Sequence, residues 1–216
     1  MIVKICGLKT LQDSLAACQA GADMLGFNFY QASPRFIQIE DCHHIVAEVK
    51  SAYPEVICVG VFVNHSVGQI TKIMSLTGLD LAQLSGDDTG ETHHQLGEIG
   101  FHALRSHSMG ELDAALKKIR HRKNPPAFLL DSVQKGSYGG SGKTGNWQLA
   151  AEAARHYPIL LAGGLDPDNV EAAIKTVRPW GVDVASGVES QRGVKDAKKI
   201  VDFIHAAKRA YQFERS

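Results

Sequence analysis

The hydrophobic positions of this chain form short apolar runs that alternate with longer segments of helical spacing. The clearest run is 56–63, where the apolarity is continuous rather than alternating. Strands buried on both faces of a parallel sheet have this pattern. Directly after it, the segment 67–77 carries apolar residues at helical spacing behind Ser66, a favourable N-cap residue. This part of the chain is therefore predicted to be a buried strand followed by a helix.

The same alternation extends over the whole chain. We expect eight strands, at 3–6, 23–29, 56–63, 79–84, 101–105, 127–130, 159–162 and 182–185. We expect eight helices, at 10–20, 39–51, 67–77, 91–99, 110–120, 147–155, from Asp166-Pro167 onward, and at 195–210, with a frayed tail at 211–216. Strict alternation implies parallel strands joined by crossover helices, and eight such units close into a barrel. The prediction is one α/β domain over residues 1–216, a (β/α)8 TIM barrel of eight parallel strands.

A doubly wound open sheet is the rival architecture. Such sheets often carry a GxGxxG turn after the first strand. Here that turn is Cys6-Gly7-Leu8-Lys9, which lacks the motif. No linker, low-complexity tract or charge block divides the chain, so the barrel is favoured.

Composition narrows the classes of protein that this chain can belong to. Of its 216 residues, 44% are hydrophobic and 21% are charged, and 23 basic residues balance 23 acidic ones. A net charge of zero gives no sign of a nucleic-acid partner, and no apolar run approaches membrane-spanning length. No signal-peptide pattern opens the chain, and its four cysteines form no CxxC pair. We expect no nucleic-acid or membrane partner, and a cytoplasmic location.

The ten histidines raise the question of a metal site. His43-His44 and His93-His94 are adjacent pairs on predicted helices. Neighbouring side chains on a helix diverge by roughly 100°, so these pairs do not form a chelating i, i+4 face. We expect no metal site.

Three residues near the ends of predicted strands could carry chemistry. Barrel enzymes place their active sites in the loops after the strand C-termini. Cys6 ends the first strand, Arg35 follows the second and Asp131 follows the sixth. An aspartate there is a candidate general acid or base, and an arginine can bind a carboxylate or phosphate through two donors. From position alone, Cys6 fits a small buried hydrophobe better, as most lone cysteines are. Arg35 fits a solvated surface residue equally well.

Glycine-rich turns follow the last three predicted strands. The loop 136–145 is not a Walker A motif, because Ser137 stands where that motif needs glycine. We interpret it as a cradle of backbone N–H groups for a phosphate. Gly163-Gly164 and Ser186-Gly187 follow strands seven and eight, where many barrels hold a phosphate. A phosphorylated substrate is therefore expected.

Together these motifs resemble the phosphoribosylanthranilate isomerase family over nearly the whole chain. The residues that carry the resemblance are 4–7, 20–23, 26–27, 33–35, 59–64, 130–131, 139–144, 161–165, 169–170, 182–189, 193 and 195–196. The resemblance implies the Amadori rearrangement of N-(5'-phosphoribosyl)anthranilate to 1-(2-carboxyphenylamino)-1-deoxyribulose 5-phosphate, a step of tryptophan biosynthesis that needs no cofactor.

The resemblance also implies roles for individual residues. Asp131 would be the general acid that opens the ribose ring, and Cys6 the general base that removes the C2' proton. Arg35 would face the anthranilate carboxylate. The remaining residues expected to bind substrate are Gln83, Ser85, Gly142, Gly163, Gly164, Asp183, Ser186 and Gly187.

The sequence departs from the family pattern in two places. Ser85 stands where the family usually has histidine, and Gly145-Asn146 replaces a usual Phe-Asp. Both changes bear on substrate positioning and leave the acid and the base in place. The alternatives are another phosphosugar isomerase of this barrel type, or a phosphate-binding barrel that has lost catalysis and serves as a partner subunit. A monomer or a homodimer would fit either case.

Lys4 suggests how the thiol could act as a base. A thiol must be partly ionised to accept a proton, and nearby positive charge favours the thiolate. Period-two alternation places Lys4 on the same side of the strand as Cys6. We therefore hypothesise that Lys4 lowers the pKa of Cys6.

Overall fold

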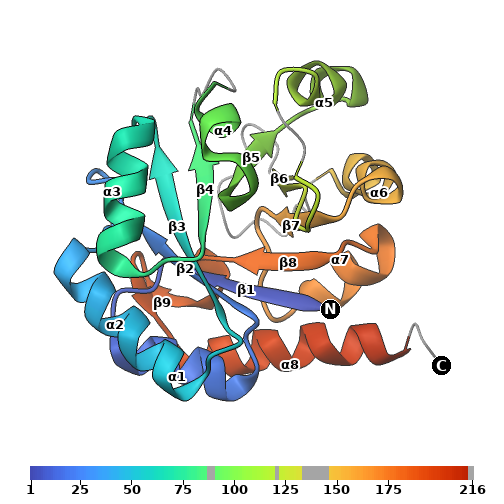
Figure 1. The fold of residues 1–216 in the computed structure, drawn as a ribbon. Helices are drawn as coiled ribbons and strands as arrows, with labels where there is room; N and C mark the ends of the chain where they lie inside the picture. The colour runs from blue at the N-terminus through green and yellow to red at the C-terminus, as the bar shows by residue number, and fades with distance from the viewer. Residues whose placement is uncertain (87–90, 120–121, 133–145, 214–216) are drawn as a thin grey trace.

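The eight predicted strands form a closed barrel of parallel strands in the order β1 to β8 (Figure 1). The computed structural model describes residues 1–86, 91–119, 122–132 and 146–213. Pairing of Ile2 with Gly181 joins β1 to β8 and closes the barrel. The strands are β1 (Ile2–Cys6), β2 (Met24–Asn28), β3 (Ile57–Val63), β4 (Leu81–Ser85), β5 (Gly100–Arg105), β6 (Phe128–Asp131), β7 (Ile159–Ala162) and β8 (Gly181–Val184).

The helices form a ring outside the strands, as the crossover connections of a parallel barrel require (Figure 1). They are α1 (Leu11–Ala20), α2 (Ile39–Ala52), α3 (Val67–Thr77), α4 (Glu91–Leu96), α5 (Met109–Leu116), α6 (Trp147–His156), α7 (Val170–Val177) and α8 (Ala197–Phe213). Short 3-10 turns lie at η1 (Gly97–Ile99) and η2 (Ser186–Val188).

Several helix starts follow from capping residues visible in the sequence. The side chain of Thr10 accepts a hydrogen bond from the backbone N–H of Asp13 and begins α1. Ser66 and Gln69 form a capping box at the start of α3. These residues satisfy N–H groups that a helix leaves without partners at its first turn, so they fix where each helix begins.

Successive side chains of each strand point to opposite faces of the barrel, so the buried hydrophobic side chains form two separate cores. One set points outward and packs under the helices in a large cluster that includes Phe27, Phe128 and Phe203. The other set points into the barrel, where Met24, Phe101 and other residues form a smaller cluster. Some inward positions nearer the strand C-termini, such as Gln83 and Asp183, are polar, and that end of the barrel holds the pocket described below.

The structure corrects two helix boundaries near the C-terminus. We predicted that a helix opens at Asp166-Pro167, but α7 begins at Val170. The Asp166 carboxylate instead accepts hydrogen bonds from the backbone N–H groups of Asp168 and Asn169, which forms a turn before the helix. We also predicted a frayed tail from Tyr211, but α8 continues to Phe213, since no glycine or proline interrupts it.

A small antiparallel hairpin lies between β8 and the last helix, where we predicted a helix from Lys195. It consists of β9 (Glu189–Gln191) and β10 (Val194–Lys195). Lys195 pairs with Glu189 in this hairpin, and α8 therefore begins only at Ala197. The other predicted elements are found with boundaries shifted by a few residues, such as α5, which ends at Leu116 rather than at 120.

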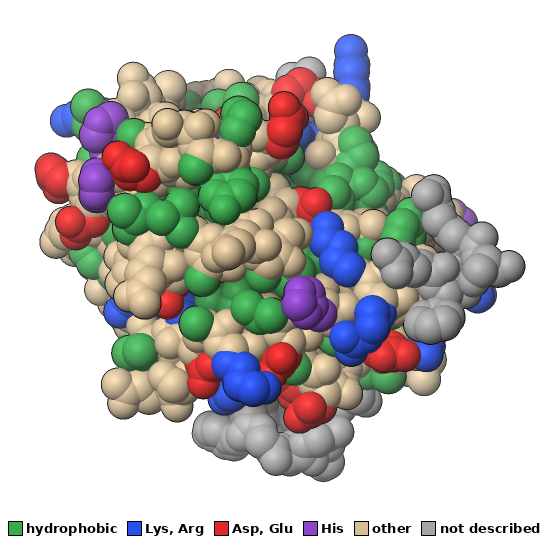
Figure 2. Space-filling model, turned by 90° about the horizontal axis from the view of Figure 1, so that it is seen from below, with side chains coloured by type: hydrophobic (Ala, Val, Ile, Leu, Met, Phe, Trp, Pro, Cys, Tyr) green, Lys and Arg blue, Asp and Glu red, His purple; other side chains and the backbone are tan. Residues whose placement is uncertain are grey.

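The exterior shows no gathering of one charge sign on the face seen in Figure 2, where basic and acidic side chains are interspersed. This agrees with equal numbers of basic and acidic residues in the chain. Within the described residues, no helix is long and apolar enough to cross a membrane.

Candidate active site

A pocket of about 780 Å³ opens at the C-terminal ends of the barrel strands. Nine of the residues predicted to act on the substrate line it, namely Cys6, Arg35, Gln83, Ser85, Asp131, Gly163, Gly164, Asp183 and Ser186. Gly187 lies next to this lining, against the loop after β7. Gly142 and the predicted cradle 136–145 lie outside the described residues.

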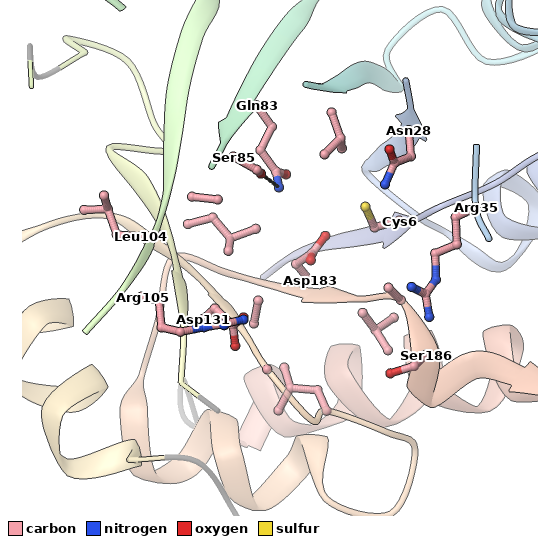
Figure 3. Close-up of a pocket in the computed structure, with 18 of the residues that line it drawn as sticks. Cys6, Asn28, Arg35, Gln83, Ser85, Leu104, Arg105, Asp131, Asp183 and Ser186 are labelled. Atoms are coloured by element: carbon pink, nitrogen blue, oxygen red, sulfur yellow. Dashed lines mark hydrogen bonds and ion pairs between the residues drawn. The ribbon is translucent and has the colours of Figure 1, made fainter. Parts of the chain in front are cut away.

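Cys6 ends β1 with its thiol directed into the pocket (Figure 3). Gly26 is its register partner on β2, and a Cβ atom there would lie 2.8 Å from the Cys6 sulfur. Glycine at position 26 therefore makes room for the thiol. Burial raises the pKa of Cys6, and the positive charge of Lys4 is the largest effect that opposes this rise.

Lys4 is fully buried directly below Cys6 on the same side of β1. Its ammonium donates hydrogen bonds to Asp183 at 2.6 Å and to Gln83 at 2.9 Å. Burial opposes the charged form, but the charges of Asp183 and Cys6 outweigh it and raise the pKa of Lys4. Lys4 acts on the thiol in the predicted direction, yet burial keeps the pKa of Cys6 above its ordinary value.

Arg35 reaches the same side of the pocket from the loop after β2. Its Nε and Nη2 atoms donate to the two carboxylate oxygens of Glu189, at 2.6 and 2.9 Å. Lys195 also donates to Glu189, at 3.2 Å, and so does the backbone N–H of Gly193. Burial opposes ionisation of this carboxyl, but the bonds from Arg35 and Gly193 and the charge of Lys195 lower the pKa of Glu189. Arg35 is thus a held side chain rather than a freely solvated one.

Asp131 lies at the end of β6, across the pocket from Cys6 (Figure 3). Its neighbour on β5 is Arg105, which is its register partner. Nη2 of Arg105 donates to the Asp131 carboxylate at 2.5 Å, and the Arg105 side chain is 63% exposed. Asp183 lies between Cys6 and Asp131 in the view of Figure 3. A ligand in the pocket would therefore lie between a thiol and a carboxyl group.

The loops after β7 and β8 approach each other at the edge of the pocket. Gly163 and Gly164 both have left-handed backbone conformations, with φ of 100° and 68°. Gly187 needs glycine for a different reason, because a Cβ atom there would collide with the carbonyl oxygen of Leu165. Such turns bring backbone N–H groups close to a ligand without side chains in between.

Sequence reasoning missed three charged residues of this site. Arg105 ends a predicted strand, and the strand-end criterion that selected Asp131 could have selected it too. Glu189 and Lys195 belong to motifs that carry the family resemblance. Glu189 pairs with Arg35 across 154 residues, and a pairing over that distance leaves no local pattern. Lys195 joins the cluster through Glu189. Within the described residues, no group of three or more His, Cys, Asp or Glu could hold a metal ion.

Comparisons with known proteins converge on one family. The family model described as N-(5'-phosphoribosyl)anthranilate (PRA) isomerase matches residues 3–206. An N-(5'-phosphoribosyl)anthranilate isomerase of Roseiflexus sp. is 45% identical over 216 residues, covering 97% of this chain and 99% of the relative.

Solved structures give the same result. The crystal structure of phosphoribosyl anthranilate isomerase from Thermotoga maritima superposes with a TM-score of 0.84 at 38% identity, covering 96% of this chain and 99% of that one. A complex of such an enzyme with reduced 1-(o-carboxyphenylamino)-1-deoxyribulose 5-phosphate has a TM-score of 0.81 at 35% identity and the same coverage. A further structure, at 36% identity and a TM-score of 0.80 with the same coverage, shows monomers generated from the dimeric Thermotoga maritima enzyme.

Proposed function

This chain belongs to the N-(5'-phosphoribosyl)anthranilate isomerase family, and we propose that Cys6 and Asp131 carry out the family's reaction in it. That reaction is the rearrangement of N-(5'-phosphoribosyl)anthranilate to 1-(2-carboxyphenylamino)-1-deoxyribulose 5-phosphate, a step of tryptophan biosynthesis. The observation that carries the assignment of roles is the placement of the Cys6 thiol and the Asp131 carboxyl group on opposite sides of one pocket.

The two groups divide two proton transfers between them. Asp131 gives a proton to the ribose ring oxygen, the bond from C1' to that oxygen breaks, and a Schiff base forms between C1' and the anthranilate nitrogen. The thiolate of Cys6 then takes the proton from C2', which leaves an enol-amine. The enol-amine then tautomerises to the ketose, gaining a proton at C1' and releasing the proton of the C2' hydroxyl, so the substrate is isomerised without gain or loss of atoms. Groups on different strands suit this sequence because the two protons move at different atoms of the substrate.

Arg35 is assigned to the anthranilate carboxylate. Its two bonds to Glu189 use Nε and Nη2, and we assign Nη1 to the substrate. Glu189 fixes the plane of the guanidinium, so little side-chain freedom is lost when the substrate binds. An isomerase acting on a sugar phosphate without a carboxylate would have no use for this arrangement, which argues against that alternative.

The loops after β7 and β8 are assigned to the phosphate group. Gly163, Gly164, Ser186 and Gly187 are the residues concerned, and their backbone N–H groups can approach phosphate oxygens closely. Gly142 remains a predicted part of this site. Gln83, Ser85 and Asp183 also line the pocket and are assigned to the ribose portion.

The setting of the enzyme is part of the proposal. The closed barrel supports one continuous catalytic domain over residues 1–216. The four free cysteines support a reducing compartment, so we propose that the enzyme works in the cytoplasm. We propose that it needs no cofactor. We propose a monomer or a homodimer, the latter because a dimeric relative is known.

A direct assay tests the reaction itself. Purified protein is mixed with freshly made phosphoribosylanthranilate, the fall in its anthranilate-type fluorescence is followed, and the product is separated and weighed by mass spectrometry. We expect a rapid fall in fluorescence and a new compound of unchanged mass. Folded protein that leaves the fluorescence at the rate of the buffer control would refute the proposed function.

A further inference from the structure

Lys195 is not one of the residues that line the pocket, but it lies beside the wall that carries Cys6. Its side chain is 2% exposed, and its ammonium donates to the carbonyl oxygen of Ala185 at 2.7 Å and to Glu189 at 3.2 Å. Ala185 lines the pocket and directly follows Val184, the register partner of Ile5 on β1. The Ala185 carbonyl that accepts the hydrogen bond from Lys195 therefore lies beside Cys6, at the end of the strand next to β1.

The charges on this side of the pocket do not cancel. Lys4 is paired with Asp183, so this buried pair contributes no net charge. Glu189 is shared by Arg35 and Lys195, so two cations face one carboxylate. Of the two clusters beside Cys6, the one around Glu189 holds the excess of positive charge.

We propose that Lys195 is a positioning residue for the reaction, whose buried ammonium supplies the uncompensated positive charge that favours the thiolate form of Cys6. The inference rests on the proposed role of Cys6 as the base. It adds Lys195 to the task that the sequence suggested for Lys4, because Asp183 offsets part of the effect of Lys4 on the thiol.

The electrostatics of each group support this assignment. Burial raises the pKa of Cys6; Lys4 opposes the rise, Asp183 adds to it, and Lys195 opposes it again. Burial lowers the pKa of Lys195, while the charges of Glu189 and Cys6 favour its ammonium form. Arg35 and Glu189 are further charged groups on this side of the pocket, and Lys199 donates to the backbone carbonyl of Glu189. Arg35 disfavours a second cation at Lys195. The Cys6 thiolate therefore favours the ammonium form of Lys195, and the Lys195 ammonium favours the thiolate form of Cys6.

The test measures the reactivity of Cys6 independently of the isomerase reaction. Iodoacetamide alkylates a thiolate, and mass spectrometry of the Cys6 peptide gives its rate as a function of pH. Burial raises the pKa of Cys18 to about 11 and that of Cys58 to about 12, so these thiols serve as unreactive internal references. The rate is compared in wild type, Lys195→Met, Lys195→Gln and Lys195→Arg, with the isomerase kcat and KM of each.

Lys199→Met is the matched control. Lys199 donates to the backbone carbonyl of Glu189 at 2.9 Å rather than to its carboxylate, so the same substitution is made nearby without loss of the paired charge. Lys195→Gln keeps a donor for Ala185 and decides the result if Lys195→Met does not fold.

We expect alkylation of Cys6 at neutral pH to slow at least about tenfold in Lys195→Met and Lys195→Gln, with a parallel fall in kcat and a smaller change in KM. Lys195→Arg should restore most of the rate, and Lys199→Met should match wild type. Folded Lys195 variants that alkylate at the wild-type rate would overturn the inference even if the isomerase is active. A wild type with no isomerase activity and a Lys195-dependent alkylation rate would instead refute the proposed function.

Discussion

The proposed base, Cys6, and the proposed acid, Asp131, lie across one pocket in opposite surroundings. Cys6 stands above a buried ion pair in which the Lys4 side chain is 0% exposed and the Asp183 side chain 10%. Asp131 stands in an exposed pair, where its side chain is 26% exposed and that of Arg105 63%. Both pairs join a cation to a carboxylate at similar distances, 2.6 and 2.5 Å, so burial is what separates them.

The difference teaches that the two pairs serve different purposes. Breaking a buried pair leaves a charge in a medium that cannot solvate it, and this is strongly destabilising. An exposed pair is screened by water and contributes little to stability. We infer that the buried Lys4–Asp183 pair is held rigidly and provides a fixed electrostatic environment in which the Cys6 thiol can ionise. The Asp131 side is a partly exposed carboxyl group in the pocket lining.

The largest expected effect on stability comes from breaking the buried pair. Asp183→Asn leaves the Lys4 ammonium without its carboxylate, so we expect the free energy of unfolding to fall by about 3–5 kcal/mol. Urea denaturation followed by circular dichroism measures it. Asp202→Asn, which breaks the exposed pair of Asp202 with Lys198 on α8, is the control and should lose at most about 1 kcal/mol. Equal losses in the two variants would show that burial does not distinguish these pairs.

A smaller effect on the same side should depend on pH. The pKa of Glu189 is lower in the folded protein than its ordinary value, so its ionised form stabilises the fold above that value. This stabilisation is lost as the pH falls through the lowered pKa of Glu189, because the folded state must then bind the proton. Glu189→Gln should therefore flatten the acid side of the stability curve, measured by urea denaturation at several pH values below 6. An unchanged acid slope would contradict the charge assignment of the Glu189 cluster.

The smallest effect on stability is expected on the acid side. Arg105→Gln removes the exposed partner of Asp131, and the free energy of unfolding should change by about 0–1 kcal/mol. The same denaturation experiment measures it, with Arg155→Gln, in an exposed pair with Glu152, as the matched control. If Arg105→Gln lowered the free energy of unfolding as much as Asp183→Asn, the proposed difference between the buried and the exposed ion pair would be wrong.

The barrel could be predicted from the sequence because its signals are local. Continuous apolar runs such as 56–63 identify buried strands, and Thr10 and Ser66 mark helix starts through hydrogen bonds within three residues. The short hairpin that contains Lys195 left no comparable signal, because two or three residues per strand are too few for periodicity to be read. The start of α7 was misplaced because an aspartate before a proline also suits a turn.

The candidate site was predicted only in part for the same reason. Cys6, Asp131 and the glycine turns follow strands directly, so the topology of a barrel brings them together. The partners of Arg35 and Lys4 are set by packing across the closed barrel, and Lys4 and Asp183 are 179 residues apart. Side-chain pairing over such separations becomes visible only once the strands are in register.

The central claim is that Cys6 and Asp131 are the base and the acid of the isomerase reaction. It is tested most directly by the rate of fluorescence loss from phosphoribosylanthranilate in Cys6→Ser and Asp131→Asn, beside Cys18→Ser and Asp202→Asn as matched controls. We predict that kcat falls at least about 100-fold in each of the first two variants and stays near wild type in the controls. A folded Cys6→Ser or Asp131→Asn protein that turns over at the wild-type rate would contradict the account.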